Sequence, residues 1–189
     1  MPENSEGREN EQEEIEPVIE YAQKGDCSAI AEVDRDRMLQ RLEEHGCPLR
    51  EFNKEERVEQ LKKEIADPNK RYLVLKIEGQ TAGYIELVNN TEWVKKFKCK
   101  RNTVFASTIS VIRPYQGQGN GPKLVERAIE NAKDLFGAKY MRANVIMENE
   151  PAVKMWQNVG FKQVTDPQPT GGTWDGKPSH TIMMEKVLE

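Results

Sequence analysis

Three alternating glycines near the centre of the chain form the strongest candidate for a ligand-binding segment. Gly117, Gly119 and Gly121 follow Gln116 in the run QGQGNG, and Pro122 comes directly after them. Glycine lets a ligand approach the main chain because it has no Cβ atom. If a helix begins here, its first N–H groups have no internal partner, and the helix dipole adds roughly half a positive charge. The segment therefore predicts a site for an anionic group such as a pyrophosphate.

The residues on either side of these glycines predict a strand before them and a helix after them. An apolar, β-branched run over residues 109–112 ends just before Arg113 and Pro114. Pro122 suits the first turn of a helix, where its missing N–H costs little. Apolar residues then recur with helical spacing from Leu124 to Phe136. We expect a strand, a glycine-rich turn and a helix over residues 107–136.

Three known ligand-binding turns use this physics. A phosphate-binding loop of the GxxxxGKS or GxxxxGKT type is excluded, because no such Lys and hydroxyl residue follow the glycines. A dinucleotide fingerprint needs GxGxxG, whereas this run reads GxGxG and lies late in a short chain. The third pattern, Q/R-x-x-G-x-G/A, is satisfied by Gln116, Gly119 and Gly121. By itself this motif leaves open a glycine-rich connection that binds nothing.

The third pattern resembles motif A of the GNAT superfamily of acyl-CoA-dependent N-acetyltransferases, in which the turn carries the pyrophosphate of coenzyme A. A second segment strengthens this resemblance. Residues 139–147 read as a strand, and residues 149–161 are then similar to the family's next helix, N-x-x-A-x-x-x-Y-x-x-x-G-F. The matching positions are Asn149, Ala152, Gly160 and Phe161. The resemblance covers residues 71–188, and the N-terminal third agrees only in outline.

The resemblance implies an α/β fold with a mixed, largely antiparallel central sheet of about 6–7 strands and helices on both faces. Residues 1–14 are rich in glutamate, so we expect a disordered acidic tail there. Residues 15–189 are expected to form a single N-acetyltransferase domain, which is long enough to bury a sizeable core.

The remaining elements follow from local patterns and stop signals. Residues 90–102 hold five basic side chains within Lys95 to Arg101, and we expect an extended hairpin tip there. An anionic acceptor or partner could dock on this tip, although a solvated loop is the simpler interpretation. The other expected elements are a strand over 15–21, a helix from Asp26 to His45 with a break near 34–37, a helix after Asn53, a hairpin over 71–89, a short strand over 161–165, a Pro- and Gly-rich loop over 166–177 and a closing strand over 179–188.

The composition suits a highly charged surface and argues against several classes of partner. Charged residues make up 32% of the chain and hydrophobic residues 37%, with a net charge of -4. This charge gives no reason to expect a nucleic acid partner. No apolar run approaches the roughly 20 residues of a membrane span, and no secretory signal is visible. We expect neither nucleic acid nor membrane as a partner, while a homodimer stays open.

The cysteines and histidines do not suggest disulfides or a metal site. Cys27, Cys47 and Cys99 are widely spaced and lack a CxxC motif. This usage favours reduced thiols and a cytoplasmic location. His45 and His180 form no cluster with them at metal-site spacing, so we expect no metal.

The resemblance implies acetyl-CoA as the cosubstrate and indicates which residues would bind it. In the family, the central strand and the next parallel strand splay apart, and exposed main-chain groups bind the pantetheine arm as a ligand adds to a sheet edge. The Val111 N–H would then lie near the thioester oxygen. The predicted coenzyme-binding residues are Ile109, Ser110, Val111, Gln116, Gly117, Gln118, Gly119, Asn120, Gly121 and Asn149.

Acetyl transfer also needs a neutral amine and a proton for the leaving thiolate. A lysine-like amine costs about 4–5 kcal/mol to deprotonate at pH 7. Glu86 is the candidate base, although its strand parity leaves a surface position open, and Glu148 is a second choice. Trp156 stands at the position where the family usually has a tyrosine that acts as general acid on the departing thiolate. Its indole N–H does not give up a proton near pH 7, so the proton would come from water or another tyrosine, while Trp156 either bonds the sulfur or fills space.

The sequence thus predicts an N-acetyltransferase that moves an acetyl group from acetyl-CoA to a primary amine of a small molecule or peptide, by direct attack in a ternary complex. The alternative is a coenzyme A-binding sensor or interaction module with little catalysis, which Trp156 favours. The acceptor stays open. Glu86, Glu92 and Asp175 could face a cationic acceptor, whereas the basic segment would suit an acidic peptide.

Overall fold

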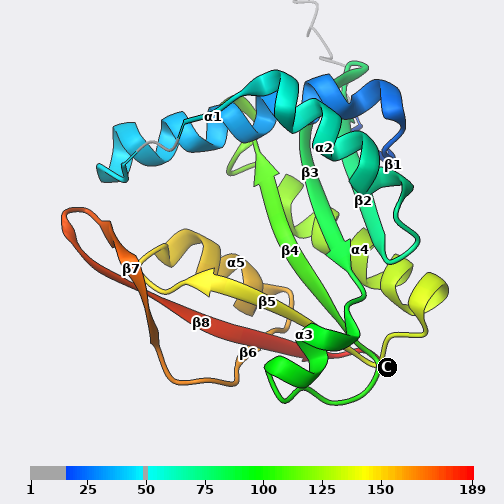
Figure 1. Ribbon diagram of the computed structural model, residues 1–189, viewed down its shortest axis with the longest axis vertical. Helices are drawn as coiled ribbons and strands as arrows, with labels where there is room; N and C mark the ends of the chain where they lie inside the picture. The colour runs from blue at the N-terminus through cyan, green and yellow to red at the C-terminus, as the bar shows by residue number, and fades with distance from the viewer. Residues whose placement is uncertain (1–15, 49–50) are drawn as a thin grey trace, which may run out of the picture.

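The computed structural model describes residues 16–48 and 51–189, and a mixed sheet is at its centre (Figure 1). The described strands are β1 (Val18–Tyr21), β2 (Lys70–Ile77), β3 (Gln80–Val88), β4 (Thr103–Val111), β5 (Tyr140–Ile146), β6 (Lys162–Gln163), β7 (Gln168–Trp174) and β8 (Lys177–Val187). They form one eight-stranded sheet in the order β1-β2-β3-β4-β5-β8-β6, with β7 paired to β8. Only β4 and β5 pair in parallel among these strands. The expected mixed, largely antiparallel α/β fold is confirmed.

Helices cover both faces of the sheet (Figure 1). On one face, α1 (Cys27–His45) and α2 (Lys54–Ala66) pack against Tyr72 and Tyr84. On the other, α4 (Asn120–Phe136) and α5 (Glu150–Asn158) pack against Leu73 and Ile85. The short helix α3 (Thr91–Lys96) lies beside the start of β4. Of the helices in the described ranges, none is both long and apolar enough to cross a bilayer.

Three local predictions were wrong. Helix α1 is continuous and has no break at residues 34–37. The Arg37 side chain donates to Asp34, one turn earlier, at 2.9 Å, and this bond stabilises the helix at the predicted break. Residues 91–96 form α3 instead of an extended tip, since the Asn90 side chain accepts from the N–H groups of Glu92 and Trp93. Residues 168–174 form β7 instead of a loop, which raises the strand number above the expected six or seven. The predicted tail, residues 1–14, and Ile15 lie outside the described residues.

The sheet divides between β4 and β5. The two strands pair only from Thr103 opposite Tyr140 to Ala106 opposite Ala143. Beyond this point β4 stays with β3 and β5 stays with β8 (Figure 1). Ser107 has no partner on β3, and this bulge lies at the point where the parallel pairing ends. Because a bulge bends its strand and increases the local twist, it turns β4 away from β5.

A buried polar network holds α1 and α2 to the sheet. Asp34 of α1 is 3% exposed and accepts hydrogen bonds from the Tyr84 hydroxyl of β3, from Arg37 at 2.9 Å and from Arg57 of α2 at 2.8 Å. Burial and the Asp34 charge raise the pKa of Tyr84, so its hydroxyl keeps its proton and donates. The carboxylate of Asp34 therefore fixes the position of both helices over β3.

We expect Asp34→Asn to lower the free energy of unfolding by roughly 3 kcal/mol, because removing one partner of a buried ion pair leaves the other charge uncompensated. Urea denaturation of the two proteins measures this loss. Glu43→Gln is the matched control, since its ion pair with Arg113 at 2.6 Å is exposed to solvent and such pairs contribute about 1 kcal/mol or less. Equal, small losses in both variants would show that the network does not stabilise the fold.

Candidate functional site

The second half of β4 presents unpaired main-chain groups to the gap beside β5. The Ile112 N–H donates to the Ala82 carbonyl of β3 at 2.9 Å. Main-chain groups of successive residues in a strand point to opposite sides, so those of Ile109 and Val111 face away from β3 and toward the gap. Those of Ser110 face β3. The strand thus offers the N–H and carbonyl of Ile109 and the N–H of Val111 to an added, strand-like ligand, while the Val111 carbonyl accepts from the Gln116 side chain.

The glycine turn leaves the start of α4 without a cap. Gly117 and Gly119 have φ of 74° and 78°, a left-handed conformation that strains any other residue. Gly119 is the N-cap residue, and no side chain bonds to the helix start. The first described helical bond runs from the Lys123 N–H to the Gly119 carbonyl at 3.2 Å. The N–H groups of Asn120 and Gly121 are therefore available to an anion, as the sequence predicts.

Side chains of the turn hold it in shape. The Gln116 amide donates to the Val111 carbonyl at 2.7 Å and to the Gln40 side chain of α1 at 2.9 Å. Gln118 donates to the Pro114 carbonyl at 2.8 Å. These bonds join the end of β4, the turn and α1 into one unit.

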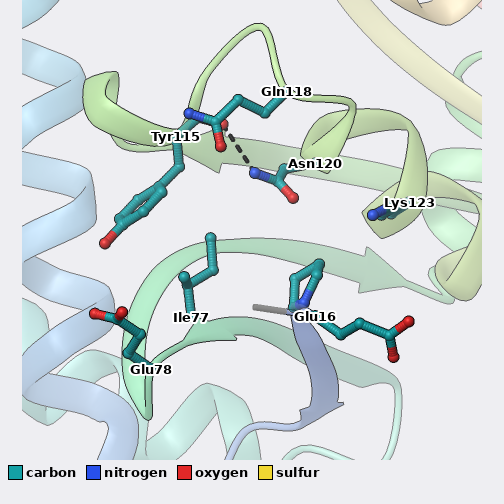
Figure 2. A pocket seen from close by; sticks show the side chains of 8 residues that line it. Glu16, Ile77, Glu78, Tyr115, Gln118, Asn120 and Lys123 are labelled. Carbon is teal, nitrogen blue, oxygen red and sulfur yellow. Dashed lines mark hydrogen bonds between the residues drawn. The ribbon is translucent and has the colours of Figure 1, made fainter. Parts of the chain in front are cut away.

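A hollow of about 450 Å³ lies on the side of the turn that faces β1 and β2. Figure 2 shows Gln118, Asn120 and Lys123 above it and Ile77 below, with a hydrogen bond from the Asn120 amide to the Tyr115 carbonyl, which measures 2.9 Å. Gly121 instead lies near Met155 of α5, since a Cβ there would be 3.8 Å from the Met155 Cγ. The gap beside β5 and this hollow are thus on different sides of the turn.

Helix α5 follows β5 and borders the gap from the other side. The side-chain oxygen of Asn149, Oδ1, accepts from the Ala152 N–H at 3.2 Å and caps the helix. Trp156 is 3% exposed and meets Phe161 edge-on, with ring centroids 4.7 Å apart. Trp156 is thus part of the core, and Asn149 lies between the end of β5 and the start of α5.

Glu86 is buried on the face of the sheet that carries α1 and α2. It is 7% exposed, lies opposite Thr108 of β4 and accepts from Lys70 at 3.0 Å. Burial alone would lower the pKa of Lys70, but its hydrogen bonds to Glu86 and Glu64 raise it. Lys70 therefore stays charged beside Glu86. The surface position that the strand parity left open is ruled out.

The other acidic candidates lie apart from Glu86. Glu148, at the end of β5, accepts from the N–H and the ring of His180 at 2.9 Å and 2.8 Å. Burial alone would raise the pKa of Glu148, but these bonds hold it below its usual value. Glu92 is exposed on α3, where it pairs with Lys95. The exposed basic segment lies at the start of β4, the opposite end from the glycine turn.

The C-terminal end of α1 contacts the hairpin of β7 and β8, which sequence reasoning missed. The His45 ring stacks on Trp174 at 3.8 Å, and its Nδ1 lies 2.9 Å from the Asp175 carboxylate. The Cys47 thiol donates to the Thr173 carbonyl at 3.2 Å. Together these contacts join the C-terminal end of α1 to the β7–β8 hairpin. A strand prediction over residues 168–174 would have placed Trp174 and Asp175 at the tip of a hairpin. An aromatic and an acidic residue side by side at such a tip are the sequence signal that could have indicated this contact.

Comparisons with known proteins agree on one family. A family model described as the acetyltransferase (GNAT) family matches residues 36–161, more than half of the chain. The L-amino acid N-acyltransferase MnaT of Escherichia coli is 29% identical over 182 residues, which cover 90% of this chain and 94% of that protein. The N-alpha-acetyltransferase of Sulfurisphaera tokodaii is 26% identical over 97 residues. This match covers 49% of the chain and only 57% of the archaeal protein.

A solved structure shares the fold. The acetyltransferase yncA of Salmonella typhimurium, solved with its cofactor acetyl-CoA, superimposes with a TM-score of 0.73 and 24% identity. The superposition covers 92% of this chain and 95% of that protein. At this level of identity the likeness establishes the fold alone.

Proposed function

Because this chain belongs to the acetyltransferase (GNAT) family, whose members are acyl-CoA-dependent transferases, we propose that it acetylates a primary amine of a small molecule or peptide. The acetyl group comes from acetyl-CoA, and the amine attacks it directly in a ternary complex. The observation that carries the proposal is the unpaired edge of β4, which ends at the uncapped start of α4. An extended arm with a terminal pyrophosphate fits both features at once.

The coenzyme would lie along β4 with its phosphates at the glycine turn. The N–H groups of Asn120 and Gly121 bind the pyrophosphate, and the helix dipole adds to the attraction. The pantetheine arm takes the place of a neighbouring strand and bonds to Ile109 and Val111. The Val111 N–H then polarises the thioester carbonyl, where charge develops in the transition state. Asn149 contacts the arm from the rim of α5.

Proton transfer is assigned to Glu86 and water. Glu86 is buried beside β4 and lies on the α1 side, away from the coenzyme-binding helices. A carboxylate in this position takes the proton of the ammonium through a water chain and gives the amine its nucleophilic form. Protonation of the thiolate falls to water, since the indole of Trp156 is a donor that keeps its proton.

The relatives favour a small acceptor. MnaT, whose name specifies L-amino acids, matches this chain over nearly its whole length. The archaeal N-alpha-acetyltransferase matches over little more than half of its own length. The contacts that join α1 to the β7–β8 hairpin also leave less room for a peptide.

A coenzyme A-binding sensor with little catalysis is the second candidate, because Trp156 replaces the usual acid. Calorimetry with acetyl-CoA and with coenzyme A, followed by thiol-release assays with a panel of amines, separates the candidates. Binding with turnover supports the transferase, and binding without turnover on any amine supports the sensor. Absence of binding at millimolar coenzyme would exclude both the transferase and the sensor.

We expect Gly119→Glu to weaken coenzyme A binding by about 100-fold or more, because the carboxylate repels the pyrophosphate and the loss of two charge-assisted hydrogen bonds alone reaches about 3 kcal/mol. Calorimetry on the folded variant measures the affinity. Gly137→Glu is the matched control. Gly137 has a positive φ of 56° at the other end of α4, so the backbone strain is similar but the charge is remote. Unchanged affinity in a folded Gly119→Glu protein would remove the central claim.

We expect Trp156→Tyr to keep or raise turnover, because a phenol supplies the acid that the indole lacks. The smaller ring lowers the free energy of unfolding by about 1–2 kcal/mol through lost packing. Steady-state rates at saturating acetyl-CoA measure the effect, and Trp156→Phe is the control without a hydroxyl. A large loss of turnover in Trp156→Tyr, with coenzyme binding intact, would show that the indole itself is required.

A further inference from the structure

Two arginines on the inner face of α1 have buried nitrogens without partners. Arg37 and Arg41 are one helical turn apart and share a face with Asp34. Within the described residues, the Nε atoms of both side chains are buried and make no hydrogen bond. Arg37 donates to Asp34 through another nitrogen, so its charge is balanced. Its guanidinium still has an unused donor.

Arg41 has no acidic partner in the described parts of the chain, since no carboxylate lies within 4.0 Å of its guanidinium. Its side chain is half-buried, and the guanidinium carbon lies 5.6 Å from the centre of the Trp174 ring. A partly buried guanidinium whose donors lack acceptors is costly, so buried polar groups of this kind are normally hydrogen-bonded. An anion would supply the acceptor that the buried Nε of Arg41 lacks among the described residues.

The contacts of Arg37 and Arg41 show where the two side chains lie relative to the gap beside β4. Arg37 is bonded to Asp34, and Asp34 is bonded to Tyr84 of β3. Tyr84 is directly opposite Ser110, the neighbour of Val111 in β4. Arg41, one turn further along, reaches Trp174 of β7, on the other half of the divided sheet. Figure 1 shows α1 crossing from β3 past the tip of β4 toward β7. Since Arg37 is joined through Asp34 to Tyr84 of β3 and Arg41 reaches Trp174 of β7, the pair lies between the two halves of the divided sheet.

Building on the transferase function proposed above, we propose that Arg37 and Arg41 form a subsite for the carboxylate of the acceptor. The acceptor class is then an amine that carries a carboxylate close to its amino group, that is, a free amino acid. A planar guanidinium matches a carboxylate with paired hydrogen bonds, which gives orientation as well as affinity. Because Arg37 is connected through Asp34 and Tyr84 to the residue opposite Ser110, the neighbour of Val111, a carboxylate bound there would lie close to an amine that attacks beside Val111.

Coenzyme A does not supply this anion. Its pyrophosphate is assigned to the start of α4, which packs on the opposite face of the sheet from α1. The stacking of His45 on Trp174 also joins α1 to β7 beside Arg41, which suits a small acceptor. The anion that reaches Arg41 therefore enters with the acceptor.

The test compares each of the twenty L-amino acids with its C-terminal amide as acceptor for the full-length protein, by thiol release from acetyl-CoA. We expect the preferred acid to exceed its amide in kcat/KM by about 10- to 100-fold, the effect of one or two bonds to a charged group. Arg41→Gln should remove that preference, mainly through KM for the acid. The amide rates and the KM for acetyl-CoA should not change.

The matched control is Arg35→Gln, which removes an arginine from the solvent side of the same helix, where Arg35 is 59% exposed. It should retain the preference for acids. Equal use of acids and amides by the wild type, or an equal loss for both in Arg41→Gln, would overturn the carboxylate subsite and leave the transferase intact. If coenzyme binds but no amine is acetylated, the transferase fails. Calorimetry of the amino acids with coenzyme A-loaded protein then decides the subsite: binding that Arg41→Gln abolishes supports it, and absence of binding overturns it.

Discussion

The interruption of pairing between β4 and β5 is the constraint on which the rest of the molecule depends. A sheet interior normally satisfies its main-chain groups with neighbouring strands, yet here two parallel strands separate after Ala106 and Ala143 while both continue. The unpaired part of the β4 edge is then open to a partner that is not part of the chain. The helices hold this opening from outside: α1 fixes β3 and the turn, and α5 lies against the start of α4.

Local patterns predicted the elements around the coenzyme site well. The strand, glycine turn and helix over residues 107–136 depend on contacts between near neighbours and on the φ preference of glycine, which a sequence displays directly. Residues 149–161 could be predicted for the same reason, because Asn149 caps the helix that it precedes. The elements that would hold the coenzyme therefore followed from short-range rules, and the location of its site stays a prediction.

The proposed acceptor side could be predicted much less well from the sequence, because it is built from segments that lie far apart along the chain. From the sequence, Arg41 is an ordinary helix residue, and only the structure shows that β7 places Trp174 beside it. Asp34 likewise suggests a break in the helix, because the sequence does not show that Tyr84 and Arg57 bond to it. Glu86 was assigned to a strand correctly, but only Lys70 and the helices above it decide that it is buried. Charged side chains inside a protein depend on partners far away in the sequence, and such partners leave no local pattern.

The contact between α1 and the β7–β8 hairpin has a consequence for the order in which the chain assembles. His45 belongs to the first helix, and its partner Asp175 lies 130 residues later. Strand β8 inserts between β5 and β6 and carries β7 with it. On a ribosome, this hairpin is synthesised after the glycine turn and α4. Because a domain generally folds as a unit, the contact between α1 and the hairpin, and with it the proposed acceptor side, is complete only once the last strand has been made.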